Sequence, residues 1–254
     1  MFQLDHVYTE DQNFSFFEKL KGFGFTDMNR EVEHPGKHFC QFIAFAAATR
    51  RGHQYLEFIS VKEGGSRVET CGVSFGTEND LEDVFRNYLE NKEKFKAKIT
   101  HKNYLWKTDN ISILPGWNFL VFEELRLDGI LPWVTEYQSD SSRTPFAPEL
   151  AVHPNGVTGI HGLVLQVNEE GQEFFSYFFK TPITDQITLA CGKKLYFEKA
   201  ARNRVSQIVL ESKGVSELSK KYPFDGEMNF RGQPALLIEK PNKSSLVEWD
   251  MVIV

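Results

Sequence analysis

The stretch FQLDHVYTE (residues 2–10) decides the fold. Its residues alternate between the two faces of an extended chain, and aromatic and β-branched side chains are frequent in it, so it predicts a β-strand. Directly after it, Asp11 precedes apolar residues spaced about one helical turn apart, and this run ends at Gly22 and Gly24. Because Asp caps helix N-termini and glycine ends helices, the run predicts a helix.

Three more strands are expected after this helix, over residues 25–33, 39–47 and 54–61. They are separated by HPGKH (34–38) and RRGH (50–53), which are rich in residues that favour tight reversals of the chain. The first part of the sequence therefore predicts one βαβββ unit.

The same order of elements recurs along the chain, and an internal repeat of this kind determines the whole architecture. The second unit is expected as a strand over 71–76, a helix over 81–89 capped by Asn79, and strands over 99–107, 118–125 and 131–138. The third unit is shortened, with a strand over 159–167, a helix over 170–179 and short strands over 187–190 and 194–199. The fourth has a strand over 205–211, a helix over 215–222 and strands over 228–231, 235–239 and 246–254.

Each unit carries a glutamate on its last strand, and the first strands have corresponding positions. The glutamates are Glu57, Glu136, Glu198 and Glu248, and the first-strand positions are His6, Gly72, His161 and Gln207. Glutamate is depleted in strands and costly to bury unpaired, so its recurrence needs an explanation. Either the alternation of strands places each carboxylate on a solvated face, or these residues converge on a site. A histidine in an apolar strand is likewise either a hydrogen-bonded core residue or a ligand.

Composition limits the classes of function. The chain has 254 residues, of which 41% are hydrophobic, so it can bury a core as one large domain or two small ones. The formal charge is −6 and no basic stripe is present, which argues against a nucleic-acid partner. The start of the chain lacks signal-peptide features and no long apolar run occurs, so we expect a cytoplasmic protein with no membrane partner.

The cysteines do not form a recognisable framework. Cys40, Cys71 and Cys191 are odd in number, widely spaced and without CxxC pairs, which argues against a disulfide scaffold or a structural zinc knot. We interpret all three as reduced, mostly buried thiols.

Five motifs resemble the glyoxalase-like family of the vicinal-oxygen-chelate superfamily, which includes glyoxalases, bleomycin-resistance proteins and extradiol dioxygenases. They are LDHVYT (4–9), HPG (34–36), YLEFIS (55–60), LPWVTEY (131–137) and HPNG (153–156). The resemblance covers residues 1–170 by motif and the remainder by module pattern. It implies an α+β fold in which repeated βαβββ modules form cupped, incompletely closed mixed β-sheet barrels with helices outside. We expect the first pair of modules over 1–145 and the second pair over 146–254.

The resemblance also implies a metal site, because first-strand and last-strand residues of this superfamily converge on a divalent metal that polarises vicinal oxygens of a substrate. In the front half it implies His6, Glu57 and Glu136 as ligands, with Glu57 and Glu136 as catalytic residues, whereas Gly72 has no ligand to offer. A second candidate set in the back half has the ligand types of glyoxalase I: His161, Glu198, Gln207 and Glu248. Imidazole and carboxylate ligands suit Zn, Mn, Fe or Ni alike.

Substrate-binding residues are expected around the HPGKH and HPNG turns and on aromatic strands. The turns present His34, His153 and Asn155 either at a pocket mouth or simply at the surface. Trp106 and Trp133, together with Trp117, are candidates for cavity walls, although aromatic residues in strands also form cores.

These observations leave three hypotheses open. The first is a metal-dependent isomerase, lyase or dioxygenase that acts on a small oxygenated substrate, with a glutamate as general base. The second is a metal-free protein that holds a small planar ligand between aromatic side chains, as resistance proteins of the superfamily do. The third is a structural dimer module. We expect a small-molecule partner, a monomer or homodimer, and a functional pocket in the front half.

Overall fold

The first βαβββ unit is present in the computed structural model. The structure describes residues 2–28, 32–34, 36–49, 52–68, 70–77, 79–89, 94–103, 106–108, 111–113, 116–123, 125, 127–137, 148–241 and 247–254. The unit consists of β1 (Phe2–Glu10), a 3-10 turn (Gln12–Phe14), α1 (Ser15–Gly22), β2 (Val32–His34), β3 (His38–Thr49) and β4 (Gly52–Val61). The strand expected over 25–33 is observed only as β2; residues 25–28 are not in a strand, and 29–31 lie outside the described residues.

The N-cap residue of α1 is Phe14 and not Asp11 as expected, but Asp11 still binds the first turn of the helix. The carboxylate of Asp11 accepts hydrogen bonds from the backbone amides of Phe16 and Phe17, which would otherwise lack partners at the start of the helix. After the helix, Gly24 adopts a φ of 79°, a left-handed conformation that glycine adopts without steric cost.

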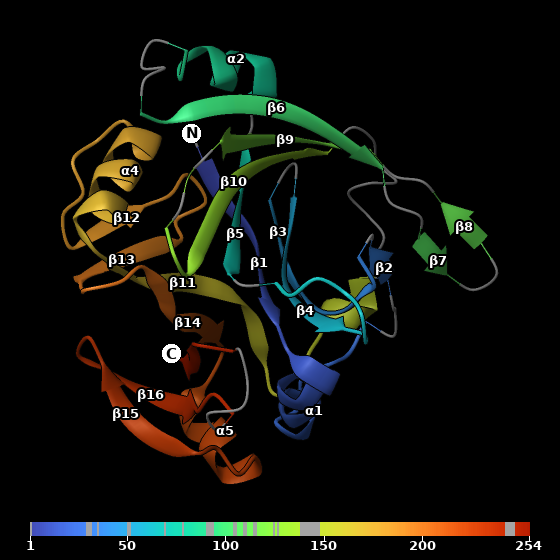
Figure 1. Cartoon of the computed structure of the whole chain (residues 1–254). Helices are drawn as coiled ribbons and strands as arrows, with labels where there is room; N and C mark the ends of the chain where they lie inside the picture. Colours follow the sequence, from blue (N-terminus) through green and yellow to red (C-terminus); the bar gives the residue numbers. More distant parts are fainter. Residues whose placement is uncertain are drawn as a thin grey trace.

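The second unit contains β5 (Cys71–Thr77), α2 (Leu81–Arg86), β6 (Lys96–Asn103), β9 (Gly116–Glu123) and β10 (Ile130–Tyr137). Its helix is capped by the Asp80 side chain, which accepts from the Glu82 amide, and not by Asn79 as expected. The strand predicted over 99–107 is divided between β6 and β7 (Trp106–Thr108). β7 pairs with β8 (Ile111–Ile113) in a separate two-stranded sheet, which stands apart from the larger sheets (Figure 1).

The back half follows the predicted order closely. The third unit is shortened, as expected, to β11 (Val157–Val167), α4 (Glu169–Phe179), β12 (Gln186–Thr188) and β13 (Lys194–Lys199). The fourth consists of β14 (Arg204–Ser212), α5 (Val215–Lys221), β15 (Gly226–Phe230), β16 (Gln233–Ile238) and β17 (Asp250–Ile253). A short 3-10 helix (Pro148–Ala151) precedes this half.

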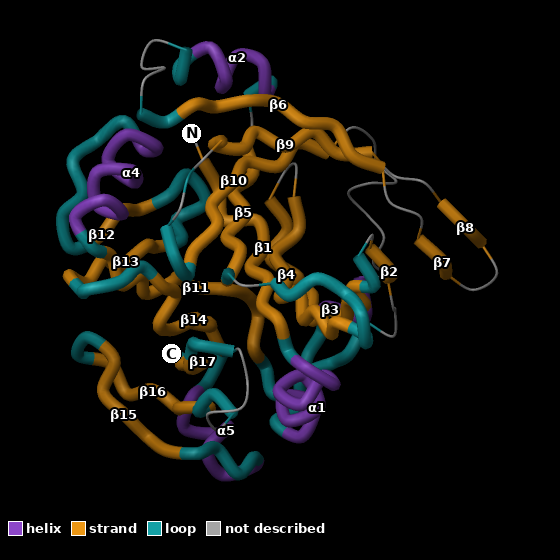
Figure 2. The backbone as a smooth tube through the Cα atoms, in the orientation of Figure 1, coloured by secondary structure: helices purple, strands orange, loops and turns teal. Residues whose placement is uncertain are grey.

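Two open mixed sheets result. The front sheet has the order β2-β3-β4-β1-β5-β10-β9-β6, and the back sheet has the order β12-β13-β11-β14-β17-β16-β15. In each sheet the first strands of two units pair antiparallel with one another, and each first strand pairs parallel with the last strand of its own unit. The prediction that first and last strands occupy the centres of two sheets is therefore confirmed. Figure 2 shows the strong curvature of the front sheet and the helices around the strands.

One hydrophobic core joins the two sheets. It contains residues of both sheets and of all four described α-helices. Phe178 of α4, from the back half, stacks on Phe2 of β1 and lies against Phe75 of β5. Gln54 of β4 is fully buried and accepts a hydrogen bond from the Ile160 amide of β11. The halves thus share buried contacts, and the division of the chain at residue 145 stays a prediction.

No helix in the described part of the chain is long and apolar enough to cross a membrane.

Candidate metal and ligand site

A cavity of about 790 Å³ lies on the concave face of the front sheet. Aromatic rings form much of its wall, namely Tyr8, Phe42, Tyr55, Trp117, Phe119 and Trp133. The period-two alternation of strands explains this lining, because alternate residues of β4, β9 and β10 face the cavity while the residues between them enter the shared core. A mostly apolar cavity with a few polar groups is the usual form of a small-molecule site.

The back sheet carries an apolar cluster on the face that is turned away from the shared core. The buried residues of this cluster are Val164, Tyr196, Val209, Phe230, Ala235 and Val252.

A β-bulge shapes the floor of the front cavity. The pairing of β1 with β5 shifts register between Leu4 and His6, so Asp5 is an extra residue. Strict alternation would have placed Leu4 and His6 on one face, but Leu4 lies in the core whereas His6 lines the cavity. Bulges re-aim side chains in this way, and they are frequent beside active sites.

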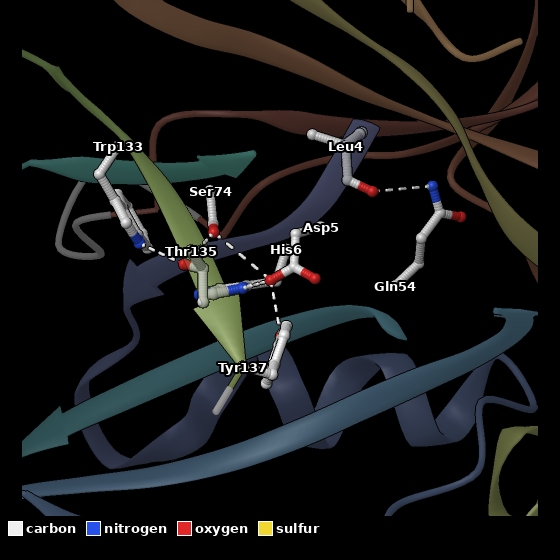
Figure 3. A network of polar contacts seen from close by, with 8 residues as sticks. All are labelled: Leu4, Asp5, His6, Gln54, Ser74, Trp133, Thr135 and Tyr137. Carbon is white, nitrogen blue, oxygen red and sulfur yellow. Dashed lines mark hydrogen bonds and ion pairs between the residues drawn. The ribbon is translucent and has the colours of Figure 1, made fainter. Parts of the chain in front are cut away.

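Asp5 is the centre of a buried polar network (Figure 3). Its Oδ2 accepts from the Tyr137 hydroxyl at 2.7 Å and lies 2.6 Å from His6 Nδ1. The Ser74 hydroxyl is 3.4 Å from the same oxygen and 2.7 Å from the hydroxyl of Thr135. Burial raises the pKa of Tyr137 well above its usual value, so the phenol stays protonated and its hydroxyl donates the hydrogen bond to Asp5.

Three potential metal ligands meet at another part of the cavity wall. Among the described residues, His34, Cys40 and Glu57 are the one group of His, Cys, Asp or Glu side chains whose ligand atoms all lie within 4.8 Å of one another. His34 Nε2 is 3.6 Å from Glu57 Oε1. Burial lowers the pKa of His34 and the Glu57 carboxylate opposes this effect, so the imidazole is favoured in the neutral form that binds metals.

Cys40 is the residue of this group that the sequence did not single out. The sequence favours a reduced, buried thiol at this position, because the three cysteines are odd in number, widely spaced and without CxxC pairs. The β2-β3 hairpin brings the two residues together, since Val32 pairs with Cys40 while His34 pairs with His38. The signal available in the sequence was the HPGKH turn, which predicts this hairpin.

Several expected site residues do lie at the cavity. His6, His34, Glu57 and Trp133 all line it, and the prediction that His6 and Glu57 face one cavity is confirmed. His6 is not part of the group formed with Glu57, so it lies beside the potential ligands. The Trp106 side chain lies outside the described residues.

Glu136 is not brought to the cavity. Its neighbours Trp133 and Thr135 line the cavity, whereas the Glu136 carboxylate accepts hydrogen bonds from the Leu81 amide at the start of α2 and from Asn118. The expected set of His6, Glu57 and Glu136 therefore does not converge. In YLEF (55–58) the glutamate is a cavity-lining residue, whereas in VTEY (134–137) the cavity-lining residue is Thr135. Neighbouring residues of a strand lie on opposite faces, so Glu136 faces away from the cavity.

His153 and Asn155 are likewise not at the cavity. His153 is buried against Phe25 and Phe45, and its Nδ1 accepts from the Thr26 amide. Asn155 is fully buried, donates to the Phe23 carbonyl and accepts from the Val157 amide. The HPNG turn therefore fixes the start of the back half against the end of α1.

The back-half candidate set is also dispersed. His161 is 3.4 Å from the Tyr196 hydroxyl, Glu198 contacts Gln166 and Arg231, and Glu248 pairs with Arg202. Gln207 pairs with Asp250 of β17 in the sheet. His161, Glu198 and Glu248 do not form a ligand group in the described structure.

The corrected position of His153 predicts a pH-dependent stability. Burial lowers its pKa from 6.5 to about 4, so below pH 6.5 the unfolded chain binds a proton that the folded chain excludes. Proton binding by the unfolded chain lowers the free energy of unfolding. This contribution to stability is therefore fully present above pH 6.5 and is lost as the pH falls toward 4. Relative to His153→Gln, the wild-type free energy of unfolding is expected to fall by on the order of 3 kcal/mol over this range. Urea denaturation at several pH values measures it, and equal pH profiles for the two proteins contradict it.

No protein-family model matches the sequence, and neither does any curated protein. Solved structures do match. A hypothetical protein from Staphylococcus aureus has a TM-score of 0.61 at 12% identity, with all of both chains covered. A Mn(II)-bound glyoxalase from Novosphingobium aromaticivorans has a TM-score of 0.56 at 10% identity, covering 99% of this chain and 81% of that one. Homoprotocatechuate 2,3-dioxygenase from Arthrobacter globiformis has a TM-score of 0.55 at 8% identity, covering 99% and 79%.

The chain has the vicinal-oxygen-chelate fold. The resemblance inferred from the motifs is thus confirmed for the architecture, and at these identities the likeness shows the fold alone. Its structural neighbours thus include a dioxygenase and a Mn(II)-bound glyoxalase.

The metal arrangement expected for the vicinal-oxygen-chelate fold does not match the residues present. It requires ligands from the first and last strands of the second module, but the residues of β10 that line the cavity are Leu131, Trp133 and Thr135, and no described residue of β5 lines it. Glycine is needed at position 72 because a Cβ there would lie 2.1 Å from the Tyr8 ring. The group His34, Cys40 and Glu57 instead belongs wholly to the first module.

Proposed function

We propose that the front cavity binds a small planar compound that bears oxygen atoms, and that His34, Cys40 and Glu57 hold a divalent metal beside it. The observation that carries this proposal is the convergence of the three ligand atoms within 4.8 Å in an aromatic-lined cavity wall. When bound, such a metal acts as a Lewis acid that polarises substrate oxygens.

The donor set favours zinc among the metals considered. Zinc takes thiolate, imidazole and carboxylate ligands together, whereas manganese prefers oxygen-rich sites. Tetrahedral bonds of about 2.0–2.3 Å place neighbouring ligand atoms roughly 3.3–3.8 Å apart. The separation of 3.6 Å between His34 Nε2 and Glu57 Oε1 is in this range. Three protein ligands leave a fourth position for an oxygen of the ligand, as in catalytic zinc sites.

The residues of the cavity supply the rest of the function. Trp117, Phe119 and Trp133 offer planar apolar surfaces, and Tyr55 stacks on the His6 ring with 4.3 Å between centroids. Lys102 lines the cavity from β6 at its exposed rim. The aromatic walls exclude water from a flat ligand and orient it, because stacked rings prefer offset parallel or edge contacts.

Calorimetric titration of the metal-free protein with Zn²⁺ tests this proposal. We expect one Zn²⁺ per chain, and an affinity at least about 100-fold lower in His34→Ala and Glu57→Ala, because loss of a mere outer partner of a ligand already costs about 10- to 100-fold. Glu198→Ala is the matched control, since this carboxylate is half-exposed and lies outside the group. Co²⁺ is expected to give a thiolate charge-transfer band that Cys40→Ser removes.

The competing function is binding of a small ligand without a metal. The aromatic lining of the cavity supports this function as well as it supports the metal-dependent one. Equal Zn²⁺ affinity in the wild type, His34→Ala and Glu57→Ala contradicts the metal site. The absence of zinc from protein purified without chelators, together with no Zn²⁺ binding, leads to the metal-free alternative.

A further inference from the structure

We propose that His6 is a base that accepts the proton of an acidic hydroxyl group, a phenol or an enol, on the ligand in the front cavity, and that Asp5 positions it. This inference extends the proposed function, since it assumes that the cavity takes a small oxygenated ligand, but it does not involve the three metal-ligand candidates.

The bulge in β1 places both members of the pair where the reaction needs them. Leu4 and Val7, which flank the pair, are buried in the shared core with 0% and 1% exposure. The register shift between Leu4 and His6 lets two consecutive residues, Asp5 and His6, lie toward the polar side of the sheet. A regular strand would have sent one of them into the core.

The hydrogen bonds fix which nitrogen of His6 carries a proton. Asp5 Oδ2 lies 2.6 Å from His6 Nδ1, and it also accepts from the Tyr137 hydroxyl at 2.7 Å. Donors converging on one oxygen favour an ionised carboxylate, which can only accept. The hydrogen is therefore on Nδ1, and the lone pair of the neutral imidazole is on Nε2.

The ring is held so that Nε2 is available to a ligand. His6 stacks on Tyr55 with an interplanar angle of 9°, and the Trp133 ring meets it edge-on with centroids 5.2 Å apart. Within the described residues Nε2 has no hydrogen-bond partner, and His6 lines the cavity. Packing on two sides prevents rotation of the ring, so the basic nitrogen stays at the cavity wall.

The other groups around the pair do not compete for the proton. Burial raises the pKa of Tyr137 well above the usual value for a phenol, so this hydroxyl stays protonated. Asp5 Oδ1 is buried without a hydrogen-bond partner in the described structure. An unsatisfied buried carboxylate oxygen is costly, and sites that break this rule are usually functional.

The proposed step is a single proton transfer. The O–H bond of the ligand breaks, its proton forms an N–H bond at His6 Nε2, and its electron pair stays on the ligand oxygen. The Nδ1 hydrogen remains between the imidazole and Asp5. Asp5 keeps its negative charge and stabilises the imidazolium, as an orienting carboxylate does beside other histidine bases. His6 is thus the catalytic residue and Asp5 a positioning residue.

Nitrogen NMR of ¹⁵N-histidine-labelled, metal-free protein tests the pair without a ligand. The His6 signals are assigned by their absence in His6→Gln. We expect a proton on Nδ1, protected from exchange, and a bare Nε2; in Asp5→Asn the protection of the Nδ1 proton is lost. Glu198→Gln is the control and leaves the signals unchanged. A proton on Nε2 in the wild type overturns the proposal.

Binding of 4-nitrophenol tests the ligand class, because its phenolate absorbs visible light. At a pH at which the free dye is mostly neutral, we expect the bound dye to be ionised. Asp5→Asn and His6→Gln are expected to bind it with an ionised-to-neutral ratio at least about tenfold lower, which corresponds to one pKa unit. A neutral dye in the wild type, equal ionisation in both variants, or no dye binding overturns this ligand class. Normal His6 signals without Zn²⁺ binding overturn the metal site alone.

Discussion

Replacement of Phe178 by alanine is expected to lower the free energy of unfolding by about 3–5 kcal/mol, the range for removal of a fully buried phenylalanine. The side chain is 0% exposed. Its ring stacks on Phe2 with centroids 4.7 Å apart and lies 5.2 Å from Phe75 and 5.8 Å from Phe122. All three partners belong to the front sheet, so the loss affects the junction of the two halves.

Urea denaturation followed by fluorescence and by circular dichroism measures this effect. Because the core is continuous, we expect both probes to report one coincident transition in the wild type. Phe224→Ala is the control, since this ring is half-buried and stacks on Phe23. A smaller loss in Phe178→Ala than in Phe224→Ala contradicts the prediction. Two separate transitions, of which only one shifts, show instead that the halves unfold independently.

Gly162→Ala is expected to destabilise the back sheet by about 2–3 kcal/mol or more, at the upper end for overpacked sites. A Cβ at this position would lie 2.2 Å from the carbonyl oxygen of Lys194. That oxygen belongs to the backbone of β13, which pairs with β11 at this point. The clash cannot be relieved by rotation of a side chain, so the two strands must separate locally.

Gly22→Ala is the matched control, because it ends α1 and a Cβ there meets nothing within 4 Å. Alanine is the better helix former, so a change within about 1 kcal/mol is expected. Thermal and urea unfolding of both variants measure the difference. Equal stability of Gly162→Ala and the wild type means that β13 can move away without cost, contrary to the observed register.

The sequence predicted the fold well because local patterns repeat. The first strands, the four α-helices and the order of strands in each unit lie close to their expected bounds. Turn residues and residues at helix starts such as Asp11 act over a few positions, so a single sequence reveals them. The exceptions are short: β2 is only three residues long, and the strand expected over 99–107 ends at Asn103 before the β7-β8 hairpin.

The site was predicted less well, because it depends on which face each side chain takes. His6, His34, Glu57 and Trp133 were placed correctly at a cavity. Glu136 follows the cavity-lining Thr135, so its carboxylate lies on the opposite face of the strand, where it accepts from the Leu81 amide of α2. Each strand position has two alternatives, and only its pairing partner decides between them.

By itself the sequence determined the βαβββ repeats, the central positions of first and last strands, and the presence of polar residues on apolar strands. Only the tertiary structure decided that Cys40 meets His34 and Glu57, and that Asp5 joins His6 on one side of β1. The physical reason is that repeat patterns follow from interactions a few residues apart. A hairpin register or a β-bulge is fixed by strands distant in the sequence, and these set the distances on which chemistry depends.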